Sequence, residues 1–434
     1  MRNKTGILVM MCLSMLLAYI PWYNYSAVAG LLSKQYSLNP VSVGLVISAF
    51  QLGYVIMVPF TGWLADRVGI RLILMVATAA TFVFSMAFGL FANSYVSILV
   101  LRLLTGIACG AIYAPGMSLL SNWFEPRRRG MAIGAYTGAL TAAYAGSYFI
   151  AAPIAAAYGW RAGIIWSSLP ALLGFILLFW VLEAPKEVHL AYDGATVPAA
   201  VPPDPCPKGG FSGPGLCTVS YMGHMWELYT FWGWIGPSMV AVAVMSGAAL
   251  AHATAFGGVL AAIIILIGAP ASYLWGLFAD RFGRFKSIVV ALAFSGAAEL
   301  LIGWLVHSLV LMTIVGLWIG FWVIADSAQY KTALTEMSEK RVRTTLLGFQ
   351  SSLGFLMGVF GPAIFGAMVK AANPGVINPA NAQVWWPAFS FLAIFPVIGI
   401  LAAIALAHSK QGHLMTGGRH SVSASPTAPT APTA

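Results

Sequence analysis

The 434-residue chain is 60% hydrophobic and only 8% charged, with a formal net charge of +10. So low a fraction of charged residues argues against a water-soluble protein and indicates a chain that is surrounded mostly by lipid. The positive balance does not indicate a nucleic-acid partner, because the sequence has no basic and aromatic surface domain that could carry such binding.

Apolar runs recur along the chain, each long enough to cross a hydrocarbon layer ~30 Å thick as a helix. Lipid permits only helices or closed barrels, and the runs lack the period-two alternation of barrel strands. We therefore predict an all-α membrane protein with 12 transmembrane helices. The predicted spans cover residues 7–30, 42–65, 72–92, 95–121, 130–152, 161–182, 218–243, 254–278, 287–306, 309–333, 345–369 and 384–407.

The positive charges gather on one side of the predicted membrane. An even number of spans puts both termini on that side, while the opposite side holds only Lys34, Arg161 and Lys370. Because basic residues are retained on the cytoplasmic side, we expect a multi-pass protein of the cell inner membrane with both termini cytoplasmic. The first apolar run is too long for a typical signal peptide and lacks a clear cleavage site, so we interpret it as a retained span.

Two charged turns repeat each other at an offset of 214 residues. "GWLADRVGIR" occupies residues 62–71 and "GLFADRFGRFK" occupies residues 276–286, and Arg129 and Arg343 agree on the same offset. This agreement predicts two pseudo-symmetric six-helix bundles in parallel order. The predicted divisions are an N-terminal bundle at 1–182, a cytoplasmic linker at 183–215, a C-terminal bundle at 216–408 and a disordered cytoplasmic tail at 409–434.

The paired turns closely resemble the signature that the major facilitator superfamily carries between spans two and three and again between spans eight and nine. "LRLLTGIACG" at the start of span four and the long middle loop also match that family, and the resemblance covers residues 7–407. It implies the MFS fold and a secondary transporter whose two bundles rock about a central site by alternating access. The chain shows no GxxxxGK[ST] loop and no HExxH or GxSxG motif, so we expect neither ATP use nor an enzyme.

The charged turns are candidates for a gate. Their glycines permit close backbone approach and unusual dihedrals, and a carboxylate can meet the positive end of a neighbouring helix. The resemblance implies that the first turn docks against the start of span eleven, and symmetry then brings the second turn to the start of span five. Such contacts would favour the outward-open state; the alternative is that the charges only set topology. The candidate gating residues are Gly62, Asp66, Arg67, Gly69, Arg71, Gly276, Asp280, Arg281, Gly283, Arg284, Arg129 and Arg343.

Small residues recur at a spacing of four in several spans, which is typical of helices that pack closely. These rows comprise Gly106 and Gly110 in span four, Gly130, Gly134 and Gly138 in span five, and Gly354 and Gly358 in span eleven.

Ionisable residues inside the membrane are expensive and are candidates for function. The resemblance implies that spans one, four, seven and ten line the cavity, and none of the charged residues in them repeats at the 214-residue offset. We predict proton coupling through Glu227, with His224 three residues away on the same face, and through Asp326. The alternatives are a structural bond between His224 and Glu227 and a buried cap at Asp326. Glu299 lies in span nine, for which we favour a structural role.

Arg102 resembles the family's arginine in span four. It is predicted to hold an anionic substrate or an acidic partner such as Glu227, with a structural ion pair as the alternative. Aromatic and amide side chains in the spans suit a small, partly apolar solute, although they equally suit helix packing. The predicted substrate-binding residues are Arg102, Tyr19, Tyr23, Asn24, Tyr136, Tyr144, Trp322 and Gln329.

These features together predict the proton-coupled symport of a small organic anion. The expected partners are the solute, the proton and membrane lipid; we expect no nucleic acid, no cofactor and no metal, and a monomer. One alternative is a proton-driven antiporter that exports a hydrophobic or cationic compound. Another is a non-transporting membrane sensor, which would need a sizeable soluble output domain that neither the linker nor the tail resembles.

Overall fold

The computed structural model describes residues 4–182, 212–338 and 342–409, and these residues form helices and short connections without any strand. In this described part, 12 helical segments are long and apolar enough to cross a membrane. The prediction of an all-α protein with 12 spans is therefore confirmed. The predicted linker ends later than the structure places it, because helix α10 already begins at Ser212. The rest of that linker, and the predicted tail beyond Ser409, lie outside the described residues.

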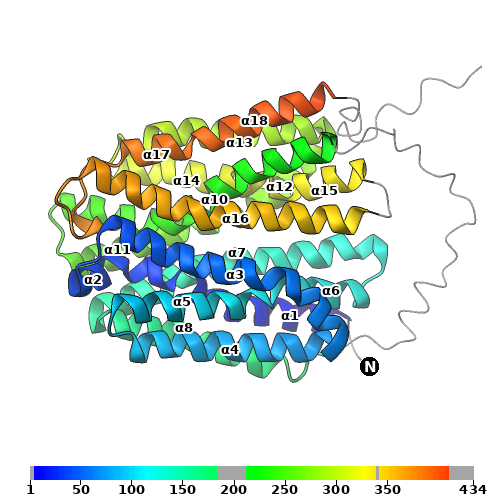
Figure 1. The fold of residues 1–434 in the computed structure, drawn as a ribbon, viewed down its shortest axis with the longest axis horizontal. Helices are drawn as coiled ribbons and strands as arrows, with labels where there is room; N and C mark the ends of the chain where they lie inside the picture. The colour runs from blue at the N-terminus through cyan, green and yellow to red at the C-terminus, as the bar shows by residue number, and fades with distance from the viewer. Residues whose placement is uncertain (1–3, 183–211, 339–341, 410–434) are drawn as a thin grey trace, which may run out of the picture.

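The first half runs from α1 to α8 and the second from α10 to α18, and Figure 1 shows the two as bundles lying against each other. The first half comprises α1 (Lys4–Tyr19), the 3-10 helix η1 (Ile20–Trp22), α2 (Asn24–Tyr36), α3 (Pro40–Val68), α4 (Ile70–Phe91), α5 (Tyr95–Gly110), α6 (Tyr113–Trp123), α7 (Pro126–Tyr158) and α8 (Trp160–Leu177). The second comprises α10 (Ser212–Met245), α11 (Leu250–Leu266), α12 (Gly268–Phe282), α13 (Arg284–Ile302), α14 (Leu309–Ala325), α15 (Ser327–Met337), α16 (Arg343–Ala372), η2 (Pro379–Asn381), α17 (Trp386–Leu392) and α18 (Ile394–Ala407).

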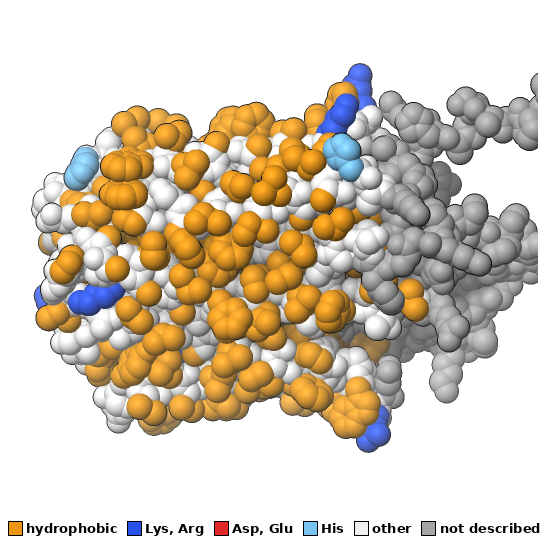
Figure 2. All heavy atoms as spheres, turned by 45° about the horizontal axis from the view of Figure 1, so that its top comes forward, with side chains coloured by type: hydrophobic (Ala, Val, Ile, Leu, Met, Phe, Trp, Pro, Cys, Tyr) orange, Lys and Arg blue, Asp and Glu red, His pale blue; other side chains and the backbone are white. Residues whose placement is uncertain are grey.

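The start of α1 and the end of α18 lie at the same end of the molecule (Figure 1), which we call the terminal end; the opposite end is the far end. Figure 2 shows hydrophobic side chains over the middle of the visible face and Lys and Arg side chains only near its two ends. Large apolar residues such as Val76, Phe149 and Leu401 are more than half exposed on the outer helix faces. This distribution is the one expected of helices whose solvent is a bilayer.

The two halves repeat at the level of the backbone. The charged turns contain Gly69 with φ 91° and Gly283 with φ 95°, a backbone conformation that residues with a side chain rarely adopt. Span four breaks at Ala111 and Ile112 between α5 and α6, and span ten breaks at Asp326 between α14 and α15. Both pairs of features agree with the offset of 214 residues found in the sequence.

The halves pack tightly at the far end. A Cβ added at Gly44 of α3 would collide with the backbone of α16 at Pro362, and one added at Gly366 of α16 would collide with the carbonyl of Pro40. The Asn378 amide donates to the Gly30 carbonyl at 2.9 Å and so ties the loop between α16 and η2 to the first span. The far end is therefore closed.

The same helices separate toward the terminal end, as Figure 1 shows for α3 and α16. A Cβ added at Gly62 of α3, or at Gly348 of α16, would meet nothing within 4 Å. The glycine row of span five was predicted to pack closely, but a Cβ added at Gly134 or Gly138 would also meet nothing within 4 Å, so the row is not packed in this conformation. Gly106 of span four packs against the backbone of Phe50, as predicted. The structure thus describes a conformation closed at the far end and open at the terminal end.

Candidate transport site

Span one is interrupted in the middle of the membrane by Pro21, and Arg102 satisfies the carbonyl groups that this interruption leaves free. Its Nη1 donates to the Pro21 carbonyl at 2.9 Å and to Asn24 Oδ1 at 3.2 Å, and its Nη2 donates to the Trp22 carbonyl at 2.7 Å. The side chain is 2% exposed. No carboxylate of a described residue lies within ion-pair distance, so the predicted pairing with Glu227 does not occur in this conformation. Arg102 therefore holds the shape of span one.

Asn24 is also fully engaged in the first half. Its Nδ2 contacts Ser85 Oγ at 3.3 Å and Ser167 Oγ at 3.1 Å, while its Oδ1 accepts from Arg102. These contacts join α2 to α4, α5 and α8. The side chain that we predicted to bind substrate is used here to fix the neighbouring backbone.

A cluster of aromatic side chains fills the middle of the molecule where the two halves meet. Its centre is Trp22, whose ring centroid lies 4.7 Å from that of Phe50, 4.9 Å from Tyr54 and 5.0 Å from Tyr144. Tyr229 of the second half lies 6.0 Å from Trp22. We call this set the aromatic cluster; its members are Tyr19, Trp22, Tyr23, Phe50, Tyr54, Tyr144, Tyr148, Tyr229, Trp232 and Phe355.

Several polar atoms in and beside the aromatic cluster are buried without a hydrogen-bond partner among the described residues. They are Nε1 of Trp232 and both amide atoms of Gln51, which follows Phe50 on α3. Buried polar groups are normally satisfied, so unsatisfied donors at a helix interface mark a place where a polar ligand or water completes the bonding. The aromatic cluster is thus the best candidate for the central binding site.

The structure brings together only part of the predicted substrate-binding set. Tyr19, Tyr23 and Tyr144 belong to the aromatic cluster, and Tyr136 stacks 5.9 Å from Tyr113 in the first half. Two members lie elsewhere. Trp322 packs at 4.7 Å against Trp275 and at 4.8 Å against Phe294, at the junction of α12, α13 and α14, and Gln329 Oε1 accepts from Arg284 at 3.2 Å.

Trp22 is the central residue that the sequence analysis missed. Its position directly after Pro21, in a span that must break its helix there, was the available signal.

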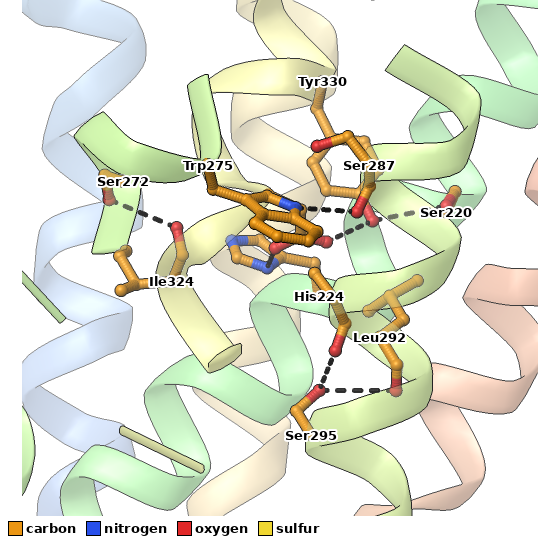
Figure 3. Close-up of polar contacts among 11 residues, drawn as sticks. Ser220, His224, Ser272, Trp275, Ser287, Leu292, Ser295, Ile324 and Tyr330 are labelled. Carbon is orange, nitrogen blue, oxygen red and sulfur yellow. Dashed lines mark hydrogen bonds and ion pairs between the residues drawn. The ribbon is translucent and has the colours of Figure 1, made fainter. Parts of the chain in front are cut away.

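A second polar group of residues lies inside the second half. His224 Nδ1 is 2.9 Å from Asp326 Oδ1, and the Tyr330 hydroxyl donates to Asp326 Oδ2 at 3.0 Å. Ser220 Oγ donates to the Tyr330 hydroxyl at 3.4 Å, as Figure 3 shows. The partner of His224 is therefore Asp326 and not Glu227. The Asp326 carboxylate lies at the break between α14 and α15. It contacts His224 of α10 and Tyr330 of α15, and so links these two helices.

Glu227 and Glu299 are completely buried near this group. Neither carboxylate makes a well-formed hydrogen bond to a described residue, and Ser295 and Glu299 are neighbours of Glu227. Ser295 lies beside Glu227, but its hydroxyl is occupied by the Ala291 carbonyl at 3.0 Å. Glu299, which we expected to be structural, thus belongs to the same acidic set as Glu227. We call His224, Glu227, Glu299 and Asp326 the titratable cluster.

Lys331 is a cation inside span ten that the sequence analysis overlooked, although it lies within the span predicted at 309–333. Its Nζ donates to Ser351 Oγ of α16 at 2.7 Å and lies 4.2 Å from the ring centroid of Tyr221 of α10. The inventory of intramembrane charges was sufficient to find it.

The charged turns are described only in part, since the side chains of Asp66, Arg129 and Arg343 lie outside the described residues. In the second turn, Arg284 contacts Asp280 at 2.8 Å and Glu336 at 3.4 Å. Asp280, whose side chain is 67% exposed, thus pairs within its own turn in this conformation.

In the same charged regions, Gly276 meets nothing within 4 Å. Arg67 lies over the Trp63 ring at 4.2 Å, Arg281 lies over the Phe282 ring at 5.4 Å, and Arg71 donates to the Phe179 carbonyl at 2.7 Å. The proposed docking between halves needs a closed terminal end, so the gating role stays a prediction.

Comparison with known proteins identifies the architecture. A family model described as Major Facilitator Superfamily matches residues 11–257. A hexuronate transporter of Bacillus subtilis (strain 168) is 25% identical over 377 residues, which are 85% of this chain and 88% of that protein. A probable sulfoacetate transporter, SauU, of Cupriavidus necator is 32% identical over 181 residues, 42% of this chain and 40% of that one.

Among solved structures, a bacterial homologue of the human lysosomal transporter Spinster, in an inward-facing and occupied conformation, matches with a TM-score of 0.75 and 19% identity. It covers 94% of this chain and 98% of its own. These matches agree with the 12 spans and the duplicated turns described above. The chain belongs to the major facilitator superfamily, and is a multi-pass membrane transporter of small organic solutes and not an enzyme.

Proposed function

We propose that the protein is a proton-coupled symporter of a small organic anion, acting as a monomer in the cell inner membrane with both termini cytoplasmic. In this orientation the terminal end faces the cytoplasm, and the conformation described above is inward-open. Solute and proton would enter from the far end and leave through the open terminal end.

The observation that carries the proton coupling is the titratable cluster. Three carboxyl side chains and one imidazole lie completely or almost completely buried in one half of the protein. Burying ionised carboxylates without hydrogen-bond partners would cost several kcal/mol, whereas protonated carboxyl groups can be buried at much lower cost. Glu227 and Glu299 therefore favour a proton-loaded state when the site is dry, and they can release protons when a conformational change admits water.

The choice of an anion has two supports. The relatives reported above carry the names of acids, a hexuronate and a sulfoacetate. The three carboxyl groups of the titratable cluster carry no charge when protonated, and Lys331 has no carboxylate partner within ion-pair distance among the described residues. A cation inside the membrane is expensive unless an anion compensates it.

Uptake by proteoliposomes tests this proposal. We expect D-glucuronate or sulfoacetate to accumulate when the compartment at the far end is acidic, and the accumulation to stop when a protonophore removes the gradient. Glu227→Gln and Asp326→Asn should remove the dependence on the pH gradient, while the control Glu336→Gln, at the terminal end, should keep it. Uptake of an acid that is indifferent to the gradient would refute the coupling.

The aromatic cluster favours one alternative, a proton-driven antiporter that exports a hydrophobic or cationic compound, because aromatic faces attract cations as well as apolar groups. The same liposomes separate the two functions. An antiporter would accumulate an organic cation such as tetraphenylphosphonium against a proton gradient of the opposite direction, and would leave the acids outside.

A further inference from the structure

Lys331 is held by two neighbouring helices. Its Nζ donates to Ser351 Oγ of α16 at 2.7 Å and lies over the Tyr221 ring of α10 at 4.2 Å. A hydroxyl group and an aromatic face compensate an ammonium group only partly, since neither carries a full negative charge. No carboxylate oxygen of a described residue is within ion-pair distance of Nζ. Lys331 is therefore a positioned amine without a carboxylate partner among the described residues, and an anion bound beside Nζ would stabilise its charged form.

The helix periodicity places this cation directly beside the aromatic cluster. Ser351 lies one turn before Phe355 on the same face of α16, and the Phe355 ring is 4.8 Å from Tyr54 of the first half. Tyr221 lies two turns before Tyr229 on α10. Both partners of Lys331 are thus displaced from the aromatic cluster toward the terminal end.

The terminal side of Lys331 is the side on which the halves separate. Gly348 of α16 lies one turn before Ser351, and a Cβ there would meet nothing within 4 Å. Lys331 itself is six residues from the end of α15 at Met337, or about 9 Å at the helical rise of 1.5 Å per residue. A solute that enters or leaves through the terminal end therefore passes Lys331 next to the aromatic cluster.

We propose that Lys331, together with Ser351 and Tyr221, binds the carboxylate or sulfonate group of the transported solute, while the aromatic cluster receives the remainder of the molecule. This inference rests on the proposed function, because it specifies the residue that recognises the organic anion. The Nζ keeps donor hydrogens beyond the one given to Ser351, so it can contact an acid without losing that bond. The Ser351 hydroxyl donates to the Leu347 carbonyl at 2.7 Å, so Ser351 acts on the acid by orienting Nζ, whose hydrogen bond its oxygen accepts.

The site also adjoins the titratable cluster. The Tyr221 ring is 5.9 Å from the His224 ring and 5.4 Å from the Tyr330 ring, and Tyr330 donates to Asp326. An anion bound at Lys331 would therefore change the electrostatic field at the pair formed by His224 and Asp326. This neighbourhood gives a direct physical route by which solute binding and proton binding affect each other.

Binding measurements on the purified full-length protein in detergent test the inference. The probes are D-glucuronate and sulfoacetate, with D-glucose as the neutral counterpart of D-glucuronate, and the readout is the dissociation constant from isothermal titration calorimetry. We expect the wild type to bind at least one acid more tightly than D-glucose. Lys331→Gln should weaken that binding by about 10- to 100-fold, the range typical of a lost charged hydrogen bond.

Two further variants keep the test interpretable. Lys331→Arg retains the positive charge and should bind the acid within about fivefold of the wild type, limited by its different shape. Lys370→Gln is the matched control, because Lys370 lies at the far end and its Nζ donates to the Val376 carbonyl at 2.9 Å. If Lys331→Gln does not fold, Ser351→Ala replaces it, with an expected weakening of about three- to tenfold.

The outcomes separate the two proposals. A wild type that binds an acid while Lys331→Gln or Ser351→Ala binds it equally well would overturn the assignment of Lys331 and leave the proposed function standing. A wild type that binds neither acid more tightly than D-glucose would overturn the anion class itself. A loss of affinity in Lys331→Gln with an unchanged melting temperature would support the inference, because a purely structural lysine would lower stability and not affinity.

Discussion

Replacing Arg102 by methionine tests whether this residue supports the fold or binds the solute. Methionine keeps an unbranched stem but removes three hydrogen bonds, at 2.9, 3.2 and 2.7 Å, to the Pro21 carbonyl, Asn24 Oδ1 and the Trp22 carbonyl. The acceptors are buried in the first half, so no bulk water replaces the lost donor.

The magnitude follows from these three bonds. Hydrogen bonds between membrane helices average ~0.6 kcal/mol, which sets a lower sum of about 2 kcal/mol. Charged bonds whose loss leaves buried acceptors unsatisfied cost ~1–3 kcal/mol each and overlap, which sets an upper value of about 6 kcal/mol. We therefore expect Arg102→Met to lower the free energy of unfolding by about 2–6 kcal/mol.

Unfolding in mixed micelles of dodecyl maltoside and sodium dodecyl sulfate, followed by tryptophan fluorescence, measures this loss. Arg67→Met is the matched control, because Arg67 is exposed at the terminal end and lies over the Trp63 ring at 4.2 Å. A stability of Arg102→Met within about 0.5 kcal/mol of the wild type, the usual effect of a neutral surface change, would refute our assignment of this guanidinium to span one. If solute affinity were also lost at unchanged stability, Arg102 would be a binding residue instead.

Three further predictions concern the closure of the far end and the charged turns. Gly366→Val should force α16 away from the Pro40 carbonyl and open the far end, whereas Gly348→Ala should be neutral because a Cβ there meets nothing within 4 Å. Distances between spin labels on α3 and α16 measure the opening in both variants. Equal distances in the two variants would contradict the close packing at Gly366. Asn378→Ala removes the 2.9 Å bond to the Gly30 carbonyl. A loss of about 1 kcal/mol should shift the balance between the two conformations about fivefold, as monitored by alkylation of a single cysteine placed near the far end, and an unchanged alkylation rate would count against this latch. Gly283→Ala, at φ 95°, should lower the free energy of unfolding by about 1–2 kcal/mol in the same micelle assay, and full stability would show that the turn relaxes to another conformation.

The aromatic cluster shows where sequence reasoning reaches its limit. Tyr19 and Tyr23 of span one and Tyr144 of span five were selected as aromatic residues facing the cavity, and all three are members. Trp322 was selected on similar grounds and packs instead between α12 and α13. Helical periodicity places a residue on a face but does not tell which neighbour that face meets, so membership in the cluster depends on the packing of both halves.

The titratable cluster shows the same limit for charged side chains. Hydropathy alone is enough to find His224, Glu227 and Asp326, because ionisable residues in apolar spans are conspicuous. The spacing of three residues suggested a bond between His224 and Glu227, yet the imidazole contacts Asp326 at 2.9 Å, and Glu299 lies beside Glu227. These partners come from spans seven, nine and ten, whose order in space no local pattern reveals.

The sequence by itself determined the class of protein, the number of spans and the duplication, because hydrophobic run length and a repeated turn at an offset of 214 residues are properties of the chain in one dimension. Only the tertiary structure decided that Arg102 supports span one, that Trp22 is the centre of the contact between the halves, and that Lys331 lies beside it without a carboxylate partner among the described residues. The physical reason is that a lipid solvent selects for apolar helices irrespective of their neighbours, whereas the role of each buried polar side chain depends on which atoms of other helices lie within hydrogen-bond distance.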